Sequence, residues 1–342
     1  MKNALTYLTR GCPRNCEYCA LRDAVGVGKE LDPIDWIEAF RILKSMSVEF
    51  NLILGNETWL LGMSLLDVLR HNKVPYALYT TCPEPGFSKY NFAFYSSGII
   101  DNLSCGIDYP CELDEDHPVI ADDSYFKSEA AWKGFQWIKQ HFPLVDTQGT
   151  ITVHRNNLHY LPKLVTQLSD LGVFVGINFI HWNSDGKFDF FPQKEEIQHL
   201  LFDPTDYPYL DSILDQVLKK PGLLQNPQFL QLPAKTLATM GWHCNGDPYG
   251  GPTIDSDGKL RCCGYRRGTH TPKFSIFDLP EKEAEWKEAV RMDAMECPGC
   301  CWSYPWMTHY WQQVNPELGK AVFTKHGGDH IPEEKWSKRK LQ

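Results

Sequence analysis

Short apolar runs alternate with amphipathic stretches through the first 180 residues, and this alternation limits the fold more than any other feature of the chain. Strands and helices that alternate at such a period indicate parallel βα units joined by right-handed crossovers. The runs predicted as strands are Ala4–Thr9, Phe50–Leu54, Tyr76–Thr80, Asn102–Ile107, Gly149–His154 and Val173–Ile180. The stretches predicted as helices are Pro33–Met46, Leu60–Arg70, Ser128–His141 and Leu158–Leu171.

Six strands are too few for a closed eight-stranded barrel. They favour an α/β fold of the open kind, a partial (β/α)6 TIM-like barrel. Ligands of such a barrel bind where the strands end, at their carboxyl edge. Residues that directly follow a predicted strand are therefore the first candidates for a functional site.

The last third of the chain has a different composition and a weaker periodic pattern. Residues 183–206 are charged and loop-like, and a helix is expected over Tyr207–Lys220. Beyond Leu232 the chain is dense in Gly, Pro, Cys and Trp, with little periodicity. Such a segment needs cross-links, and cysteine ligation supplies them. We expect a barrel and connecting region over residues 1–231, a small cysteine-rich domain over 232–320 and a C-terminal tail over 321–342.

Charge and cysteine usage narrow the class of protein. The net charge of −9 argues against a general nucleic-acid binder. No run approaches the roughly 18 apolar residues of a membrane helix, and no secretory signal is visible. A cytoplasmic location is expected, where disulfides are rare. The twelve cysteines then indicate metal or iron–sulfur ligation. The scattered Cys82, Cys105 and Cys111 are predicted as buried packing residues.

The clearest candidate metal site follows the first predicted strand. Cys12, Cys16 and Cys19 form a C-x3-C-x2-C motif on one short loop. Three thiolates can hold three irons of a [4Fe-4S] cube and leave the fourth iron open to a substrate or cofactor. A zinc knuckle is the alternative, but it needs a fourth nearby ligand, and no further cysteine precedes Cys82.

This motif resembles the signature of the radical S-adenosylmethionine (SAM) superfamily. Its place after the first strand fits, and so does the aromatic Tyr18 directly before the third cysteine. In that family the open iron chelates the amino and carboxylate groups of SAM. One electron from the cluster then cleaves SAM into methionine and a 5′-deoxyadenosyl radical, which abstracts a hydrogen atom from the substrate.

The resemblance extends to the end of the second predicted strand. Gly55, Asn56, Glu57 and Thr58 stand where the family has a Gly-Gly-Glu-Pro type motif that binds the amino group of SAM. Asn56 and Thr58 replace the second glycine and the proline. Gly55 and Asn56 both tolerate unusual backbone angles, so a carbonyl there can still turn toward an ammonium group.

Later strand ends supply the remaining candidates for SAM contacts. Thr81 follows the third strand with a hydroxyl for the methionyl part, and Asp108 follows the fourth as a ribose ligand. The family has a serine two residues before that aspartate, where this chain has Gly106. Arg155 represents the polar turn after the fifth strand, and Asn178 lies on the sixth, where the family often contacts adenine.

A second cysteine group lies in the last third. Thr253–Leu260 is predicted to form a β hairpin around Asp257 and Gly258. The arrangement resembles the SPASM and twitch auxiliary-cluster domains of radical SAM enzymes. The implied ligands of one auxiliary [4Fe-4S] cluster are Cys244, Cys263, Cys297 and Cys300, with Cys262 and Cys301 as possible substitutes. A structural zinc site remains open, because four cysteines also fit a zinc ribbon.

The resemblance implies a radical SAM enzyme with two [4Fe-4S] clusters, SAM as co-substrate and a flavodoxin- or ferredoxin-type reductant. A small-molecule substrate, such as a sugar, nucleoside or amino-acid derivative, is expected, since one auxiliary cluster is predicted and no leader-binding domain precedes the first strand. The alternative is a peptide- or protein-modifying enzyme. A non-catalytic metal-binding or electron-carrying module would not need the SAM-binding loop.

Overall fold

A computed structural model of the chain describes ten stretches of the sequence. They are residues 2–19, 29–54, 57–80, 91–100, 102–113, 123–183, 191–223, 227–244, 250–306 and 308.

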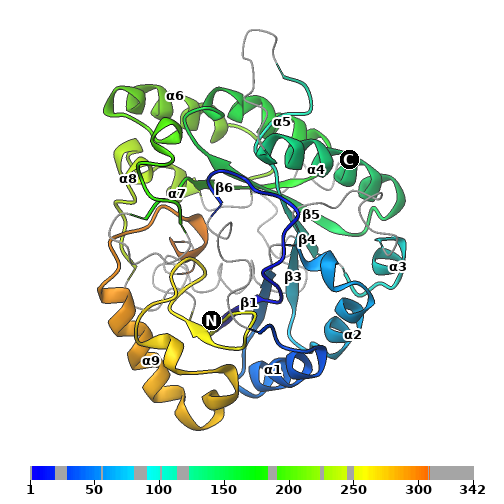
Figure 1. Cartoon of the computed structure of the whole chain (residues 1–342). Coiled ribbons are helices and arrows are strands. Elements are labelled where there is room, and N and C mark those ends of the chain that lie inside the picture. The colour runs from blue at the N-terminus through cyan, green and yellow to red at the C-terminus, as the bar shows by residue number, and fades with distance from the viewer. Residues whose placement is uncertain are drawn as a thin grey trace.

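Six parallel strands form the centre of the molecule, in the same order in the sheet as in the chain (Figure 1). They are β1 (Asn3–Tyr7), β2 (Phe50–Leu54), β3 (Tyr76–Thr80), β4 (Asn102–Gly106), β5 (Asp146–Val153) and β6 (Phe174–Phe179). Every neighbouring pair is parallel. The predicted partial (β/α)6 barrel is therefore confirmed.

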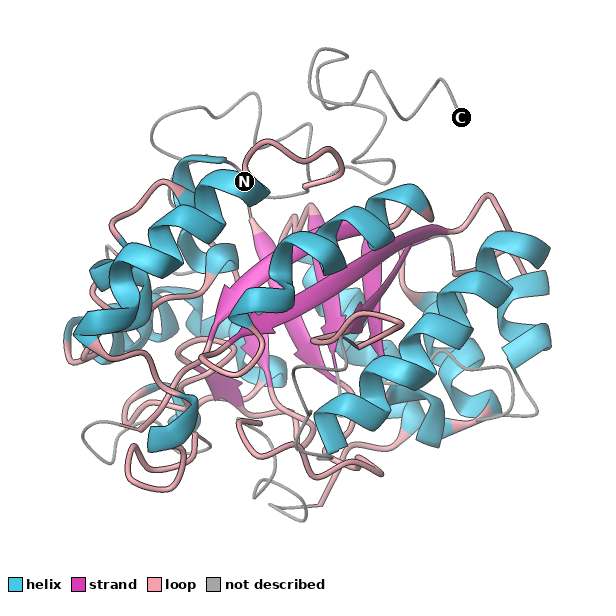
Figure 2. Ribbon diagram, turned by 90° about the horizontal axis from the view of Figure 1, so that it is seen from above, coloured by secondary structure: helices cyan, strands magenta, loops and turns pink. Residues whose placement is uncertain are grey.

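Helices cover the outside of this curved sheet (Figure 2). The α-helices are α1 (Pro33–Ser45), α2 (Met63–His71), α3 (Asn91–Ser96), α4 (Asp123–His141), α5 (Leu161–Asp170), α6 (Tyr207–Val217), α7 (Pro227–Leu230), α8 (Ala234–Ala238) and α9 (Leu279–Met295). Short 3-10 turns occur at Thr58–Leu61, Leu158–Tyr160, Gln198–Leu200, Pro204–Asp206, Thr271–Lys273 and Ile276–Asp278.

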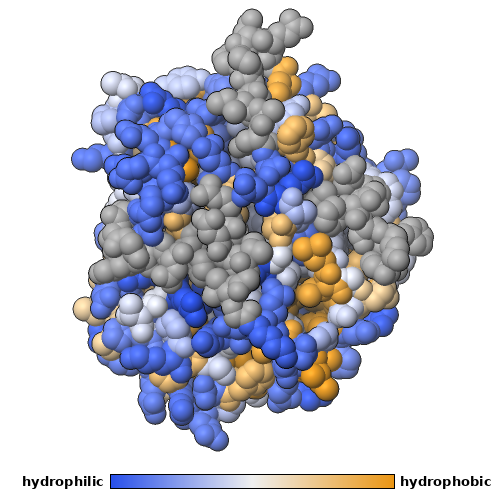
Figure 3. Space-filling view, viewed as in Figure 1, coloured by the Kyte–Doolittle hydropathy of each residue, from blue (hydrophilic) through white to orange (hydrophobic). Residues whose placement is uncertain are grey.

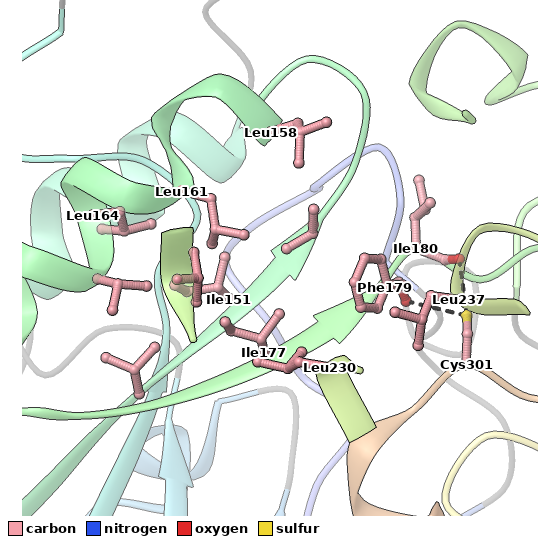
Figure 4. Close-up of a cluster of buried hydrophobic side chains, with 14 of the residues drawn as sticks. Ile151, Leu158, Leu161, Leu164, Ile177, Phe179, Ile180, Leu230, Leu237 and Cys301 are labelled. Carbon is pink, nitrogen blue, oxygen red and sulfur yellow. Dashed lines mark hydrogen bonds between the residues drawn. The ribbon is translucent and has the colours of Figure 1, made fainter. Parts of the chain in front are cut away.

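Alternate residues of each strand face the helices and form the core. On β5 and β6, Ile151 and Ile177 are at most 1% exposed and share an apolar cluster with Leu161, Leu164 and Leu168 of α5. Figure 4 shows Ile151, Ile177, Leu161 and Leu164 among the side chains of this cluster. Each such buried side chain contributes about 1.5–3 kcal/mol relative to an exposed one. The alternating apolar residues of the strands and the helically spaced apolar residues of α5 thus meet at one interface.

The predicted hairpin is present and extends the barrel sheet. Its strands are β7 (Thr253–Ile254) and β8 (Leu260–Arg261), and β7 pairs in parallel with β1, so that Leu5 lies beside Thr253. Gly258 has φ +77°, as the tight turn between the two strands requires. The sheet order is therefore β6-β5-β4-β3-β2-β1-β7-β8.

The weakly periodic segment beyond Leu232 contains one long helix that the sequence does not predict. Helix α9 runs over 17 residues there. A narrow row of its side chains, including Trp286 and Val290, is buried against the rest of the protein. Most of its other side chains are charged. The usable signals were local: a capping box formed by Ser275 and Asp278, and a proline in the first turn.

Some large apolar side chains are exposed, among them Leu60, Met63 and Leu144. The face in Figure 3 is mainly hydrophilic, with apolar side chains at several places, most prominently on the right of the view. Within the described stretches, no helix is both long and apolar enough to cross a bilayer.

Candidate functional site

The three-cysteine loop leaves the carboxyl end of β1. Cys12 and Cys19 are half-buried and Cys16 is buried. The N–H of Cys19 donates to the carbonyl of Cys16 at 3.0 Å, which closes a tight turn. The N–H of Arg14 donates to Sγ of Cys12 at 3.4 Å. Such a hydrogen bond suits a thiolate ligand, since it stabilises negative charge on sulfur.

Glu57 fastens this loop to the ends of β2 and β3. Its N–H donates to the carbonyl of Gly11 at 2.8 Å. Its buried carboxylate accepts from the hydroxyl of Thr80 at 2.6 Å and from the N–H of Trp59 at 3.2 Å. The hydroxyl of Thr58 donates to the carbonyl of Tyr79 at 3.1 Å. Glu57 and Thr58 therefore hold the loop in place, while Gly55, Asn56 and Thr81 lie outside the described residues.

Tyr18 and Asp108 both contact a buried lysine, Lys127, which the sequence pattern does not predict as part of the site. Lys127 of α4 places Nζ 2.6 Å from Oδ2 of Asp108 and 2.8 Å from the hydroxyl of Tyr18, which itself donates to the same carboxylate oxygen. The other oxygen of Asp108 accepts from the N–H of Thr152 at 2.8 Å. The glycine at position 106 leaves room for the lysine, because a Cβ there would lie 3.1 Å from Nζ.

Charge explains why this lysine stays protonated. Burial lowers the pKa of Lys127, but the carboxylate of Asp108 and the hydroxyl of Tyr18 outweigh burial and raise the pKa well above its usual value. Burial, followed by the charge of Asp108, raises the pKa of Tyr18. A cation, an anion and a neutral phenol are therefore locked together directly beside Cys16 and Cys19.

Arg155 and Asn178 have partners of their own. Arg155 is half-exposed and pairs with Asp203 at 2.8 Å and with Asp206 at 3.1 Å. Asn178 is buried, and its side-chain oxygen accepts from the N–H and the hydroxyl of Ser303 at 3.1 and 2.7 Å. Asn178 thus ties β6 to the segment after the last cysteines.

The second cysteine group surrounds the end of the hairpin. Cys244, Cys263, Cys297 and Cys300 are all half-buried. The N–H of Cys300 donates to the carbonyl of Trp242 at 2.7 Å, which brings the segment before Cys244 beside the last cysteines.

Two of these cysteines repeat the hydrogen bond found at Cys12. Cys263 accepts from the N–H of Tyr265, and Cys300 from the N–H of Trp302, each at 3.4 Å. In all three cases the donor is two residues after the cysteine. The donor set therefore fits thiolate ligation at Cys263 and Cys300, as it does at Cys12.

Cys262 and Cys301 are buried. Sγ of Cys262 lies 3.9 Å from the carbonyl of Val290 on α9, and the same thiol also contacts Cys263. Sγ of Cys301 lies 3.2 Å from Nδ1 of His181 and 3.4 Å from the carbonyl of Ile180, against the end of β6 (Figure 4). Burial lowers the pKa of His181 to about 3, so this histidine is neutral at pH 7. Cys301 therefore has the surroundings of a packing residue, whereas Cys262 remains next to the proposed ligands.

The thiols of this group influence one another. A hydrogen bond from Cys262 lowers the pKa of Cys263 to about 7. Burial raises the pKa of Cys297, and the nearby Cys263 raises it further. Burial also raises the pKa of Cys300, and the neighbouring Cys301 raises it further, with smaller effects from Cys297 and Cys263.

In the described part of the chain, no three or more His, Cys, Asp or Glu side chains are grouped to hold one metal ion. A single zinc ion draws every sulfur to about 2.3 Å from one point, whereas the thiolates of a [4Fe-4S] cube bind separate irons. Cluster and zinc both remain open for this cysteine group.

The three cysteines in the middle of the chain differ in their burial. Cys105 is buried as predicted, whereas Cys111 is exposed, so the prediction is wrong for Cys111. Cys82 lies outside the described residues.

Comparison with known proteins identifies the fold. No protein-family model and no curated protein matches the sequence. Among solved structures, anSMEcpe with bound AdoMet and the Cp18Cys peptide matches 99% of this chain and 98% of its own, with a TM-score of 0.56 and 16% identity. Streptococcus suis SuiB bound to the precursor peptide SuiA matches 87% of this chain and 69% of its own, with a TM-score of 0.56 and 12% identity. The chain therefore shares the partial-barrel fold of these two proteins.

Proposed function

We propose that this protein is a radical SAM enzyme. One observation carries the proposal: three cysteines in C-x3-C-x2-C spacing leave β1 at the carboxyl edge of a partial barrel, where the loop is fastened by Glu57. The shared fold with AdoMet-bound anSMEcpe supports it. Cys12, Cys16 and Cys19 hold the cluster, which when bound supplies the electron that splits SAM into methionine and a 5′-deoxyadenosyl radical.

The surrounding residues orient SAM and exclude water from it. The resemblance assigns the amino group of SAM to Gly55 and Asn56 and its methionyl part to Thr81, all three outside the described residues. Asp108, Arg155 and Asn178 border the rest of the molecule from the ends of β4, β5 and β6. Tyr18 contributes through its ring, which Asp108 and Lys127 hold from the hydroxyl side.

The second cysteine group holds an auxiliary [4Fe-4S] cluster on Cys244, Cys263, Cys297 and Cys300. The matching hydrogen bonds at Cys263 and Cys300 support this ligand set over one that uses Cys262 or Cys301. Its role is electron transfer or substrate anchoring.

The substrate is a small molecule that loses a hydrogen atom at the barrel mouth, and the single auxiliary site supports this class. A peptide is the second candidate, because anSMEcpe and SuiB have this fold and were each solved with a peptide. The reductant is a flavodoxin- or ferredoxin-type protein.

Anaerobic reconstitution tests the proposal. The purified protein is loaded with iron and sulfide, metals are counted, and 5′-deoxyadenosine is measured after SAM and dithionite are added. Two four-iron clusters give about eight irons per chain. Cys16→Ala is expected to abolish 5′-deoxyadenosine formation, whereas Cys111→Ala, at an exposed cysteine outside both groups, retains it.

Three results would contradict parts of the proposal. Absence of SAM cleavage in the fully loaded protein refutes the enzyme. About four irons with one zinc refutes only the auxiliary cluster. Deuterium transfer into 5′-deoxyadenosine from a labelled peptide pool, and none from labelled small metabolites, refutes the small-molecule substrate.

A further inference from the structure

Two aromatic residues occupy equivalent positions in two separate turns of the last third. Tyr265 is two residues after Cys263, and Trp302 is two residues after Cys300. In both turns the N–H of the aromatic residue donates to Sγ of the cysteine at 3.4 Å. This hydrogen bond fixes the backbone of the aromatic residue relative to the sulfur, so each ring leaves its turn from a defined point.

The rings of Tyr265 and Trp302 stack on each other. Their centres lie 3.6 Å apart, and their planes are inclined by 35°. Aromatic pairs in close contact stabilise a structure by more than their buried area alone would. The stack therefore joins the two turns directly, although they are far apart in the chain.

Two further rings support the stack from the barrel side. The ring of His181, just after β6, lies 5.3 Å from the ring of Trp302 and 6.1 Å from that of Tyr265. The ring of Phe191 lies 5.1 Å from His181 and 5.9 Å from Tyr265. The N–H of Cys301 donates to Nε2 of His181 at 3.2 Å. The stacked rings are thus held in place at the end of β6.

Backbone hydrogen bonds shape each turn separately. The N–H of Cys263 donates to the carbonyl of Arg266 at 3.1 Å, which closes the first turn. The N–H of Cys300 donates to the carbonyl of Trp242 at 2.7 Å, which fixes the second. Neither bond connects one turn to the other, whereas the ring stack does.

The three-cysteine loop has the same hydrogen bond without an aromatic donor. There the donor two residues after Cys12 is Arg14. A cysteine that accepts such a bond therefore does not require a ring at the donor position. The two rings of the second cysteine group need a separate reason, and their mutual contact supplies it.

From this arrangement we infer that Tyr265 and Trp302 are positioning residues for the second cysteine group, and that their stacked rings hold the turns of Cys263 and Cys300 together as ligands of one metal centre. Groups that hold ligands in place strengthen metal binding. The inference rests on the proposed function in one respect, that Cys263 and Cys300 ligate the same centre. It applies equally to an iron–sulfur cluster and to a zinc ion.

The retention of metal by the whole chain tests this role. Cys12, Cys16 and Cys19 are replaced by alanine, so that the metal count reports the second cysteine group alone. This parent protein is loaded anaerobically with iron and sulfide, or with zinc, and its metal is counted. The rate of metal release to an excess of chelator is then measured.

The variants remove or keep the stacked rings. Tyr265→Ala, Trp302→Ala and the double variant remove them, whereas Tyr265→Phe and Trp302→Phe each keep a ring. The control is Tyr209→Ala, because Tyr209 is an exposed tyrosine of α6, and it is expected to release metal at the parent rate.

Each single alanine variant is expected to release metal about tenfold faster than the parent. The double variant is expected to stay within about twofold of the faster single variant, because a ring that has lost its partner has no stack left to lose. Each phenylalanine variant keeps a ring in the stack and is expected to stay within about threefold of the parent.

The outcomes that overturn the inference can be told apart from failure of the site. If the parent takes up neither iron nor zinc, the second metal site and the inference fail together. If the parent retains metal but the single alanine variants match it, or their effects multiply in the double variant, only the inference fails. Should an alanine variant take up no metal, the phenylalanine variant at that position decides: normal uptake supports the ring, and an equal loss overturns the inference.

Discussion

Lys127 is a single buried cation that holds an anion and a phenol beside the proposed catalytic loop. Replacing one member of a buried ion pair leaves the other charge uncompensated, at a cost of about 3–5 kcal/mol. Lys127→Met is therefore expected to lower the free energy of unfolding by that amount, measured in urea. Lys133→Met on the same helix removes an exposed pair with Glu129 and is expected to change it by about 0.5 kcal/mol or less.

Equal stabilities for these two variants would contradict the role given to Lys127. Iron uptake during reconstitution is a second, independent measurement of the role of Lys127. Looser anchoring of Tyr18 is expected to reduce iron uptake at the N-terminal loop and to leave the auxiliary cysteines loaded.

Asp293 predicts how the stability of the fold depends on pH. It is fully buried in α9, and its carboxylate accepts from the N–H groups of Thr269, His270 and Thr271 at 2.8, 3.0 and 2.9 Å. Burial raises its pKa, but these hydrogen bonds lower it further than burial raises it. Because the folded-state pKa is below the unfolded value, the stabilisation is present above about pH 4 and is lost as the pH falls through the folded-state pKa.

The variant Asp293→Asn tests whether the carboxylate of Asp293 stabilises the fold more at neutral pH than in acid. The variant is expected to be about 2 kcal/mol less stable than wild type at pH 7. That difference should shrink as the pH is lowered toward 2.5, in urea titrations at several pH values. A difference that stays constant or grows with acidity would show that the carboxylate charge is not the stabilising feature.

At this scale the sequence offers candidate ligands more readily than the residues that support them. Spacing points to Cys12, Cys16 and Cys19, because short-range ligation leaves a short-range pattern, and their role as ligands stays a prediction. Lys127 leaves no such pattern, since a lysine normally lies in solvent. Its burial depends on its pairing with Asp108, which lies on another element.

Among the secondary-structure elements, the turn before Cys300 is the most tightly constrained. Gly299 has φ +141°, and a Cβ there would overlap the carbonyl oxygen of Met240. Gly299→Ala is expected to break the pairing of Cys300 with Trp242 and to lose the auxiliary iron selectively. Iron counting and 5′-deoxyadenosine assays check both halves of this expectation.

Gly172→Ala is the matched control. Gly172 also has a positive φ, +72°, but nothing lies within 4 Å of the added Cβ. It should cost only the backbone strain of about 1–2 kcal/mol and leave the iron content unchanged. Equal iron loss in both variants would assign the effect to general destabilisation.

The elements of the barrel and the hairpin of the last third were predictable, whereas helix α9 and the pairing of β7 with β1 were not. Strands β2 and β3 have the predicted bounds because buried parallel strands are continuous apolar runs between polar turns. Helix α9 was missed because its narrow apolar stripe gives a weak period. The pairing of β7 with β1 is a long-range contact between two short segments, which no local pattern specifies.

For the whole molecule, this pairing means that the barrel depends on the last third. A chain of residues 1–231 would lack β7 and leave the edge of β1 uncovered. An uncovered edge strand favours association with other chains. We expect that fragment to aggregate or remain partly unfolded by circular dichroism and size-exclusion chromatography. A monomeric fragment with a cooperative thermal transition would contradict this expectation.

The same pairing affects the order of events during synthesis. The first strand leaves the ribosome early, yet its partner on one side, Thr253–Ile254, emerges only after about 250 residues have been translated. Until then Arg10 has no Asp255 to pair with, and the three-cysteine loop lacks one of its anchors. Stable metal loading at the N-terminus is therefore a late event, one that follows translation of the second cysteine group.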